Sequence, residues 1–209
     1  MNKINYQKEL DKIIEEIKSE GACPKLMLHS CCAPCSSYVL EYLNKYFDIT
    51  VYYFNPNISP EGEFEKRFEE QKRLIKELPV KTDVKLIKGA YDYEEFLDAV
   101  KGYEECREGG ERCFKCYRLR LEKTARYAAD EGFDYFCTTL SISPLKNSEK
   151  INEIGYSLEK EYGVKWLPSD FKKKEGYKRS IELSREYNLY RQNYCGCVYS
   201  KFDREEKYE

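Results

Sequence analysis

Short apolar runs alternate along this chain with longer stretches whose apolar residues recur at helical spacing. The short runs predict strands at 25–29, 49–54, 83–87, 134–139 and 164–166. The longer stretches predict helices at 5–20, 36–46, 61–78, 92–101, 113–131, 148–162 and 175–188. Strands that alternate with helices form a mostly parallel sheet with helices on both faces. We therefore expect an α/β fold, built as a single domain over residues 1–209.

Two cysteine-bearing stretches, 102–131 and 170–200, lie between or after the predicted strands. In sheets of this kind, ligands bind outside the carboxyl ends of the strands. We expect the two stretches to form a cap around an active site at that edge of the sheet.

The overall charge and composition exclude several classes of protein. The chain carries 36 Lys and Arg against 38 Asp and Glu, a net charge of −2, which argues against a wholly basic nucleic-acid coat. Its 15% aromatic content argues against disorder. No run approaches the roughly 20 apolar residues that span a bilayer, and residues 1–20 lack the apolar segment of a signal peptide. We therefore expect a cytoplasmic protein with no membrane partner.

Cysteine is the most informative residue type for function. Ten cysteines in a reducing compartment indicate metal ligation or redox chemistry rather than structural disulfides. Eight of them form three groups: Cys31, Cys32 and Cys35; Cys106, Cys113 and Cys116; and Cys195 and Cys197. The first group follows the strand at 25–29, where a nucleotide-binding fold would place a glycine-rich phosphate loop, and no such loop is present.

The spacing within the other two groups suits a metal. A C-x-x-C pair brings two sulfurs within reach of one ion or cluster. Gly196 between the last two cysteines lets both sulfurs face one metal, or close a strained and reducible disulfide. Eight thiols exceed the four ligands of one zinc site and favour an iron–sulfur cluster, with thiols left over for a second iron or a redox pair.

For three further residues we expect packing or hydrogen bonding rather than metal binding. We expect Cys23 and Cys137 to be buried as ordinary packing residues. His29 ends the first strand beside the thiols, and we expect it to orient a neighbour through a hydrogen bond rather than to bind a metal.

Two stretches concentrate positive charge. Residues 112–126 have a net charge of +5 and residues 171–191 a net charge of +4. Both include aromatic residues, namely Phe114, Tyr117, Phe171, Tyr177, Tyr187 and Tyr190. Cations that hold phosphates beside aromatics that stack bases predict an RNA substrate. The alternative is two helix faces in contact with solvent.

Four motifs together resemble one known family. In order, they are HSCCAPCS, ERCFKCYRLRL, TTLSISPLKN and DFKKKEGYKRSIELSREYNLYRQNYCGCVYS. From about residue 25 to 201 the chain resembles the QueH-type epoxyqueuosine reductases. The resemblance implies reduction of epoxyqueuosine to queuosine at the wobble position of tRNA anticodons. It also implies a 4Fe–4S cluster without cobalamin, an external electron donor, and a fold like the adenine-nucleotide α-hydrolases (HUP-like).

The same resemblance assigns residue roles. Cys31, Cys32, Cys113 and Cys116 would be the cluster ligands. Cys195 and Cys197 would be a redox-active pair or ligands of a second, mononuclear iron, with Cys35 and Cys106 as further catalytic or metal candidates. His29, Asp134 and Asp170 are candidate proton donors. The candidates for binding tRNA phosphates are Lys172, Lys173, Lys174, Arg179 and Arg191.

Two other functions remain open from the sequence. An iron–sulfur-dependent tRNA sulfur transferase on the same fold would need ATP, yet no Ser-Gly-Gly-type phosphate loop follows the first strand. A non-catalytic zinc protein that binds RNA would not account for the number of thiols, which exceeds the four ligands of one zinc site. ATP-dependent thiolation of tRNA would support the first alternative, and stoichiometric zinc without sulfide would support the second.

Overall fold

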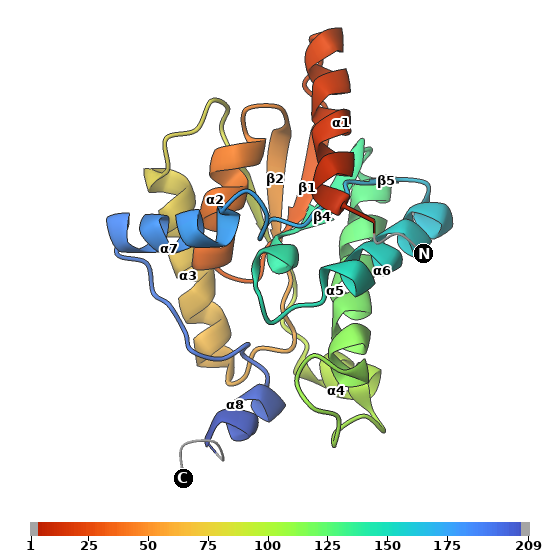
Figure 1. Cartoon of the computed structure of the whole chain (residues 1–209). Helices are drawn as coiled ribbons and strands as arrows, with labels where there is room; N and C mark the ends of the chain where they lie inside the picture. The colour runs from red at the N-terminus through yellow and green to blue at the C-terminus, as the bar shows by residue number, and fades with distance from the viewer. Residues whose placement is uncertain (1–3, 206–209) are drawn as a thin grey trace.

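Five parallel strands form the centre of the protein in a computed structural model that describes residues 4–205 (Figure 1). The strands are β1 (Lys25–His29), β2 (Asp48–Tyr53), β3 (Lys85–Lys88), β4 (Tyr135–Thr138) and β5 (Lys165–Trp166). Their order across the sheet is β3-β2-β1-β4-β5, and every neighbouring pair is parallel. The predicted α/β class with a parallel sheet is confirmed.

The strand order creates one crevice at the carboxyl edge of the sheet. From β1 the chain moves outward through β2 to β3, then returns to the other side of β1 for β4 and β5. The loops after β1 and β4 therefore leave the sheet side by side, with His29 directly opposite Thr138. This reversal is where open α/β sheets bind their ligands.

Helices cover both faces of the sheet. They are α1 (Tyr6–Glu20), α2 (Ala33–Leu43), α3 (Glu61–Glu77), α4 (Tyr93–Val100), α5 (Glu111–Asp130), α6 (Ser148–Tyr162), α7 (Gly176–Glu186) and α8 (Val198–Glu205), with a 3-10 turn η1 (Thr139–Ile142). Figure 1 shows α2, α3 and α7 on one side of the strands and α5 and α6 on the other. Helix α8 lies outside every stretch for which the sequence predicts a helix. Across residues 4–205, no helix is both long and apolar enough to cross a membrane.

Alternation along β1 connects the two cores. Leu26 and Leu28 pack with α1 and α2, whereas Met27 points to the opposite face and packs with α5 and α6. Helix α6 comes very close to β5, because a Cβ on Gly155 would lie 2.2 Å from the Trp166 ring. These contacts hold the crevice-forming loops on a rigid base.

Part of the predicted cap belongs instead to the main body. Helix α5 packs its buried Leu121 and Ala125 in the same core cluster as Phe136 of β4. An amphipathic helix of this length buries its apolar stripe against the sheet.

The two isolated cysteines differ from each other. Cys137 is buried in β4, as predicted. The prediction for Cys23 is wrong, because this thiol is exposed. Helix α1 ends at its left-handed cap Gly21, and the connection from there to β1 runs over the surface.

Candidate active site

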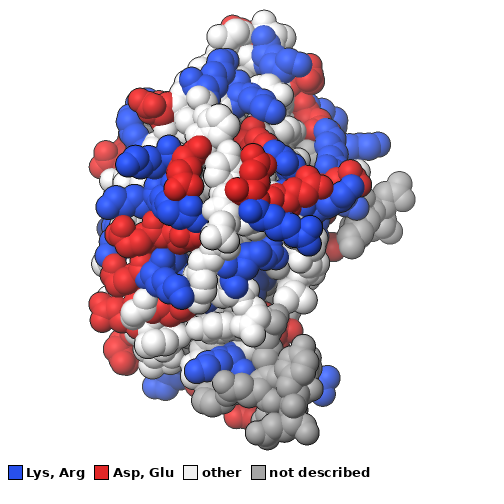
Figure 2. All heavy atoms as spheres, turned by 90° about the vertical axis from the view of Figure 1, so that its left-hand side faces the viewer, with Lys and Arg blue, Asp and Glu red and all other residues white. Residues whose placement is uncertain are grey.

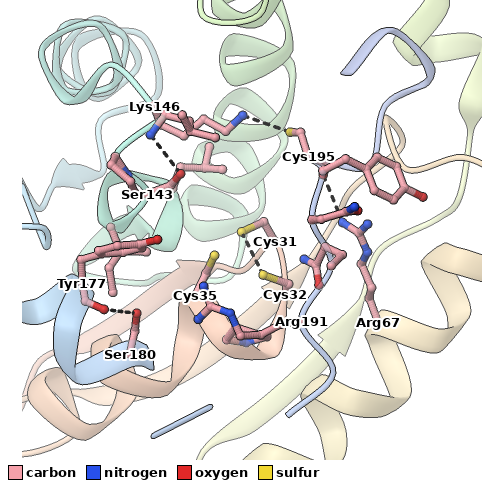
Figure 3. A pocket seen from close by; sticks show the side chains of 18 of the residues that line it. Cys31, Cys32, Cys35, Arg67, Ser143, Lys146, Tyr177, Ser180, Arg191 and Cys195 are labelled. Atoms are coloured by element: carbon pink, nitrogen blue, oxygen red, sulfur yellow. Dashed lines mark hydrogen bonds between the residues drawn. The ribbon is translucent and has the colours of Figure 1, made fainter. Parts of the chain in front are cut away.

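A cavity of about 390 Å³ lies in the crevice at the carboxyl edge of the sheet. Its walls come from segments far apart in sequence, within residues 31–35, 140–146, 177–180 and 191–195, together with Arg67, Glu108 and Arg120. Figure 3 shows side chains from these segments converging on one space. The volume falls in the range of roughly 300–1,000 Å³ of small-molecule sites.

Three thiols meet at one side of this cavity. The Sγ atoms of Cys31, Cys32 and Cys35 all lie within 4.8 Å of one another, and those of Cys31 and Cys32 are 3.8 Å apart. Cys32 is the N-cap of α2 and Pro34 lies in the first turn, so the helix starts inside the motif rather than after it. Cys35 then stands one turn beyond Cys32, on the same side of the helix. The three sulfurs lie close enough together to bind one metal ion or cluster.

These three thiols share negative charge in the absence of a metal. Hydrogen bonds from Cys32 and Cys35 hold the pKa of Cys31 well below its usual range. The same contact with Cys31 raises the pKa of Cys32 to about 12, and Cys31 raises that of Cys35 as well. A metal that binds here would displace protons from Cys32 and Cys35.

A second group of four thiols surrounds a smaller hole of about 10 Å³ beside the first cavity. It comprises Cys113 and Cys116 in the first turns of α5, and Cys195 and Cys197 immediately before α8. Cys195 lines both spaces. The structure therefore brings Cys113 and Cys116 together with the C-terminal pair, rather than with Cys31 and Cys32.

Cys106 lines neither of these two spaces. It is half-buried in the connection between α4 and α5, beside Gly110.

Gly196 allows the backbone between Cys195 and Cys197 to adopt a conformation that a larger residue would disfavour. Its φ is +113°, and a Cβ there would lie 2.9 Å from both Arg67 Nη1 and Ile58 Cγ1. Within residues 4–205, which include all ten cysteines, every cysteine is a free thiol. The alternative of a Cys195–Cys197 disulfide is therefore not what the structure contains.

Three buried cations, which the sequence analysis did not select as site residues, line the main cavity. Arg67 is 2% exposed and pairs with Glu63 at 2.7 Å. Arg120 is 1% exposed and donates from Nε to the Cys116 carbonyl at 3.2 Å. Lys146 places Nζ 3.1 Å from Cys195 Sγ (Figure 3).

The buried charge of Arg120 requires negative charge on the thiols around it. Among the described residues it has no carboxylate partner within ion-pair distance. A buried unpaired charge costs several kcal/mol, so the nearby thiolates of Cys31 and Cys195, whose pKa values are lowered, supply the compensating charge. A hydrogen bond from Cys197 and the charges of Lys146 and Arg120 hold the pKa of Cys195 well below its usual range. The donor set fits an anionic, thiolate-bound metal centre.

The three candidate proton donors do not line the cavity. His29 is fully buried, with its ring nitrogens 2.8 Å from Thr138 Oγ1 and 3.1 Å from the Phe54 carbonyl oxygen. Burial lowers the pKa of His29 to about 3, so the ring is neutral and serves to join β1 to β4 and β2. Asp134 precedes β4 at the opposite edge of the sheet and accepts from the Lys25 backbone N–H.

Asp170 and the neighbouring lysines are engaged with each other and with the body of the protein. Lys172 pairs with Asp170 at 2.9 Å and also donates to the Ser141 carbonyl. Lys174 pairs with Asp11 at 2.7 Å. Lys173 is exposed. None of these four residues lines the cavity.

The two basic stretches do not form the unpaired basic face that their charge predicts. Arg179 pairs with Glu41 at 2.6 Å, and Arg191 is the one candidate phosphate-binding residue that lines the cavity. In the other stretch Arg112 and Arg120 are buried. Figure 2, which looks onto the side that carries α3 and α7, shows acidic and basic side chains interleaved. Neighbouring carboxylates neutralise cations that the local sequence leaves in excess.

Comparison with known proteins identifies the family. The family model described as Epoxyqueuosine reductase QueH matches residues 26–203. A Staphylococcus epidermidis protein named Epoxyqueuosine reductase QueH is 47% identical over 202 residues, covering 95% of this chain and 85% of the relative. Proteins of the same name from Streptococcus pyogenes serotype M1 (46% over 200 residues; 95% and 78% covered) and Thermotoga maritima (38% over 186 residues; 88% and 93% covered) also match. This chain belongs to the epoxyqueuosine reductase QueH family of oxidoreductases.

Proposed function

We propose that this protein reduces epoxyqueuosine to queuosine at the wobble position of tRNA anticodons, at an iron–sulfur site and without cobalamin. The reaction removes the epoxide oxygen as water and consumes two electrons and two protons. The observation that carries the proposal is the cavity where thiols and buried cations converge in a chain of the QueH family. An external electron donor would supply the electrons, and the reaction would take place in the cytoplasm.

The two thiol groups would hold iron in two places. Cys31, Cys32 and Cys35 would hold a 4Fe–4S cluster, since thiolates are the usual protein ligands of such clusters. Cys113, Cys116, Cys195 and Cys197 would hold a second iron or act in part as a redox pair. When bound, the cluster would supply electrons to the epoxide one at a time.

Lys146 is the proton donor that the geometry favours. Its side chain is 8% exposed and its Nζ lies 3.1 Å from Cys195 and 3.4 Å from Glu108. Burial opposes its charge, but the thiolate of Cys195 outweighs burial and holds the pKa of Lys146 well above its usual value. The ammonium therefore keeps a proton at the cavity wall for the oxygen that leaves.

Positioning of the substrate would fall to the rim of the cavity. Arg191 lines the cavity and donates to Ser184 at 3.3 Å, which leaves other guanidinium N–H groups for a phosphate. Arg67 holds the opposite wall by donating to the Cys195 carbonyl oxygen at 3.1 Å. Substrate held between these walls would be shielded from water on the side of the sheet.

The test begins with protein purified without oxygen. We expect iron and acid-labile sulfide, and conversion of epoxyqueuosine in tRNA to queuosine with a chemical reductant, read by nucleoside chromatography. The proposal fails if reduced, iron-replete protein leaves the tRNA unchanged while a known reductase converts it. Stoichiometric zinc without sulfide would favour a zinc protein that binds RNA.

One variant checks the second thiol group. Cys113→Ser should lose iron and activity, whereas Cys23→Ser, which changes an exposed thiol outside both groups, should lose neither. Full metal content in Cys113→Ser would contradict the ligand assignment.

A further inference from the structure

Two apolar side chains stand exposed at the rim of the cavity. The large hydrophobic residues most exposed in the described part of the chain are Ile4, Leu145 (55%) and Tyr177 (36%). Leu145 and Tyr177 both line the cavity, although one lies in the connection to α6 and the other in α7. Apolar side chains that stand together at the mouth of a cavity mark an interaction site, unlike apolar residues scattered singly over a surface.

The backbone around Tyr177 is built to hold it in place. Lys174 and Glu175, immediately before α7, have φ values of +50° and +58°, which non-glycine residues rarely adopt. Gly176 follows, and a Cβ there would lie 2.1 Å from the Phe171 carbonyl oxygen and 2.4 Å from the Tyr38 ring. Disfavoured backbone persists where the surrounding structure enforces it, often at ligand-binding positions.

Tyr177 is the aromatic residue of the two basic stretches whose side chain is most exposed. Tyr117 and Phe171 are buried in the body of the protein. Tyr177 instead extends along the cavity wall, with its hydroxyl directed inward (Figure 3), and its backbone carbonyl accepts from Ser180 Oγ at 2.7 Å. A flat ring fixed at a rim is the kind of surface on which an unstacked base packs.

We propose that Tyr177, together with Leu145, forms a stacking platform for a nucleobase next to the modified nucleotide of the anticodon loop. The inference rests on the proposed function, in which the modified base enters the cavity. A neighbouring base then remains outside, over the two apolar side chains at the mouth. Arg191, from a separate segment of the lining, is placed to meet a phosphate of the same strand.

The test compares variants on an anticodon stem–loop that carries epoxyqueuosine, using iron-loaded protein. Loss of one base–aromatic stack predicts that Tyr177→Ala raises KM, and Kd measured by fluorescence anisotropy, by roughly 5- to 140-fold while kcat changes little. Tyr177→Phe keeps the ring and should remain within about twofold of the wild type. Leu145→Ala should raise KM in the same direction.

Tyr162→Ala is the matched control. Tyr162 lies at the end of α6, bonds to Glu122 and does not line the cavity, so KM should not change. The platform is overturned if Tyr177→Ala has wild-type KM and Kd, if Tyr177→Phe is as impaired as Tyr177→Ala, or if kcat falls while KM stays constant. A wild-type protein that neither binds nor converts the stem–loop would instead overturn the proposed function.

Discussion

Replacing Gly196 by Ala tests how the C-terminal thiols are held. The residue has a φ of +113°, its Cβ would meet Arg67 and Ile58 at 2.9 Å, and its carbonyl oxygen accepts from the Ser59 N–H at 2.9 Å. Alanine therefore meets an unfavourable backbone conformation and two close contacts at once.

The expected loss of folding free energy in Gly196→Ala follows from these two effects. The backbone conformation costs about 1–3 kcal/mol, and forcing a methyl group into a packed site costs about 1–3 kcal/mol more. The sum, about 2–6 kcal/mol, is a large part of a typical stability of 5–15 kcal/mol. The segment that carries Gly196 is a loop outside the sheet, held through bonds to Arg67, Ser59 and Lys146. We expect the loop to detach locally and release iron from Cys195 and Cys197.

Gly163→Ala is a control that introduces the backbone strain of Gly196→Ala without its close contacts. Gly163 ends α6 with a φ of +75°, but nothing lies within 4 Å of its would-be Cβ. This control should lose about 1–2 kcal/mol and keep its iron and activity. Urea unfolding and iron per chain, measured without oxygen, give both quantities. Equal loss of stability in the two variants, with full iron content in Gly196→Ala, would refute the reasoning.

Further predictions concern the buried cations and the isolated thiols. Arg120→Met should retain less iron per chain than Arg120→Lys, because only the lysine keeps a charge beside the thiolates; equal iron content would remove the charge argument. Lys146→Met should lower kcat by about 100-fold or more, whereas Asp134→Asn, at the far edge of the sheet, should leave kcat unchanged in the same assay. In the native protein, iodoacetamide should modify exposed Cys23. Cys137 should stay unmodified at pH 8 and at pH 9, since burial raises its pKa to about 12; peptide mass spectrometry would detect either failure.

Local patterns explain why the strands could be predicted. The apolar run 25–29 corresponds to β1 without any shift, and the helical spacing at 61–78 and 148–162 corresponds closely to α3 and α6. Each of these elements is encoded by residues within a few positions of one another. The same is true of Cys32 and Cys35, whose i, i+3 spacing places their sulfurs together once α2 forms.

Only the tertiary structure decided how the distant parts combine. Cys113 and Cys195 line the same space only because the segment after α7 folds back over the sheet edge. The local excess of charge near Arg179 disappears because Glu41 of α2 packs beside it. Lys146 faces the thiols only because the loops after β1 and β4 emerge together at the strand-order reversal. The sequence alone determined most of the helices and strands, the abundance of thiols and the family resemblance. The grouping of the thiols and the burial of the charges were decided by long-range packing, which the spacing of residues along the chain does not encode.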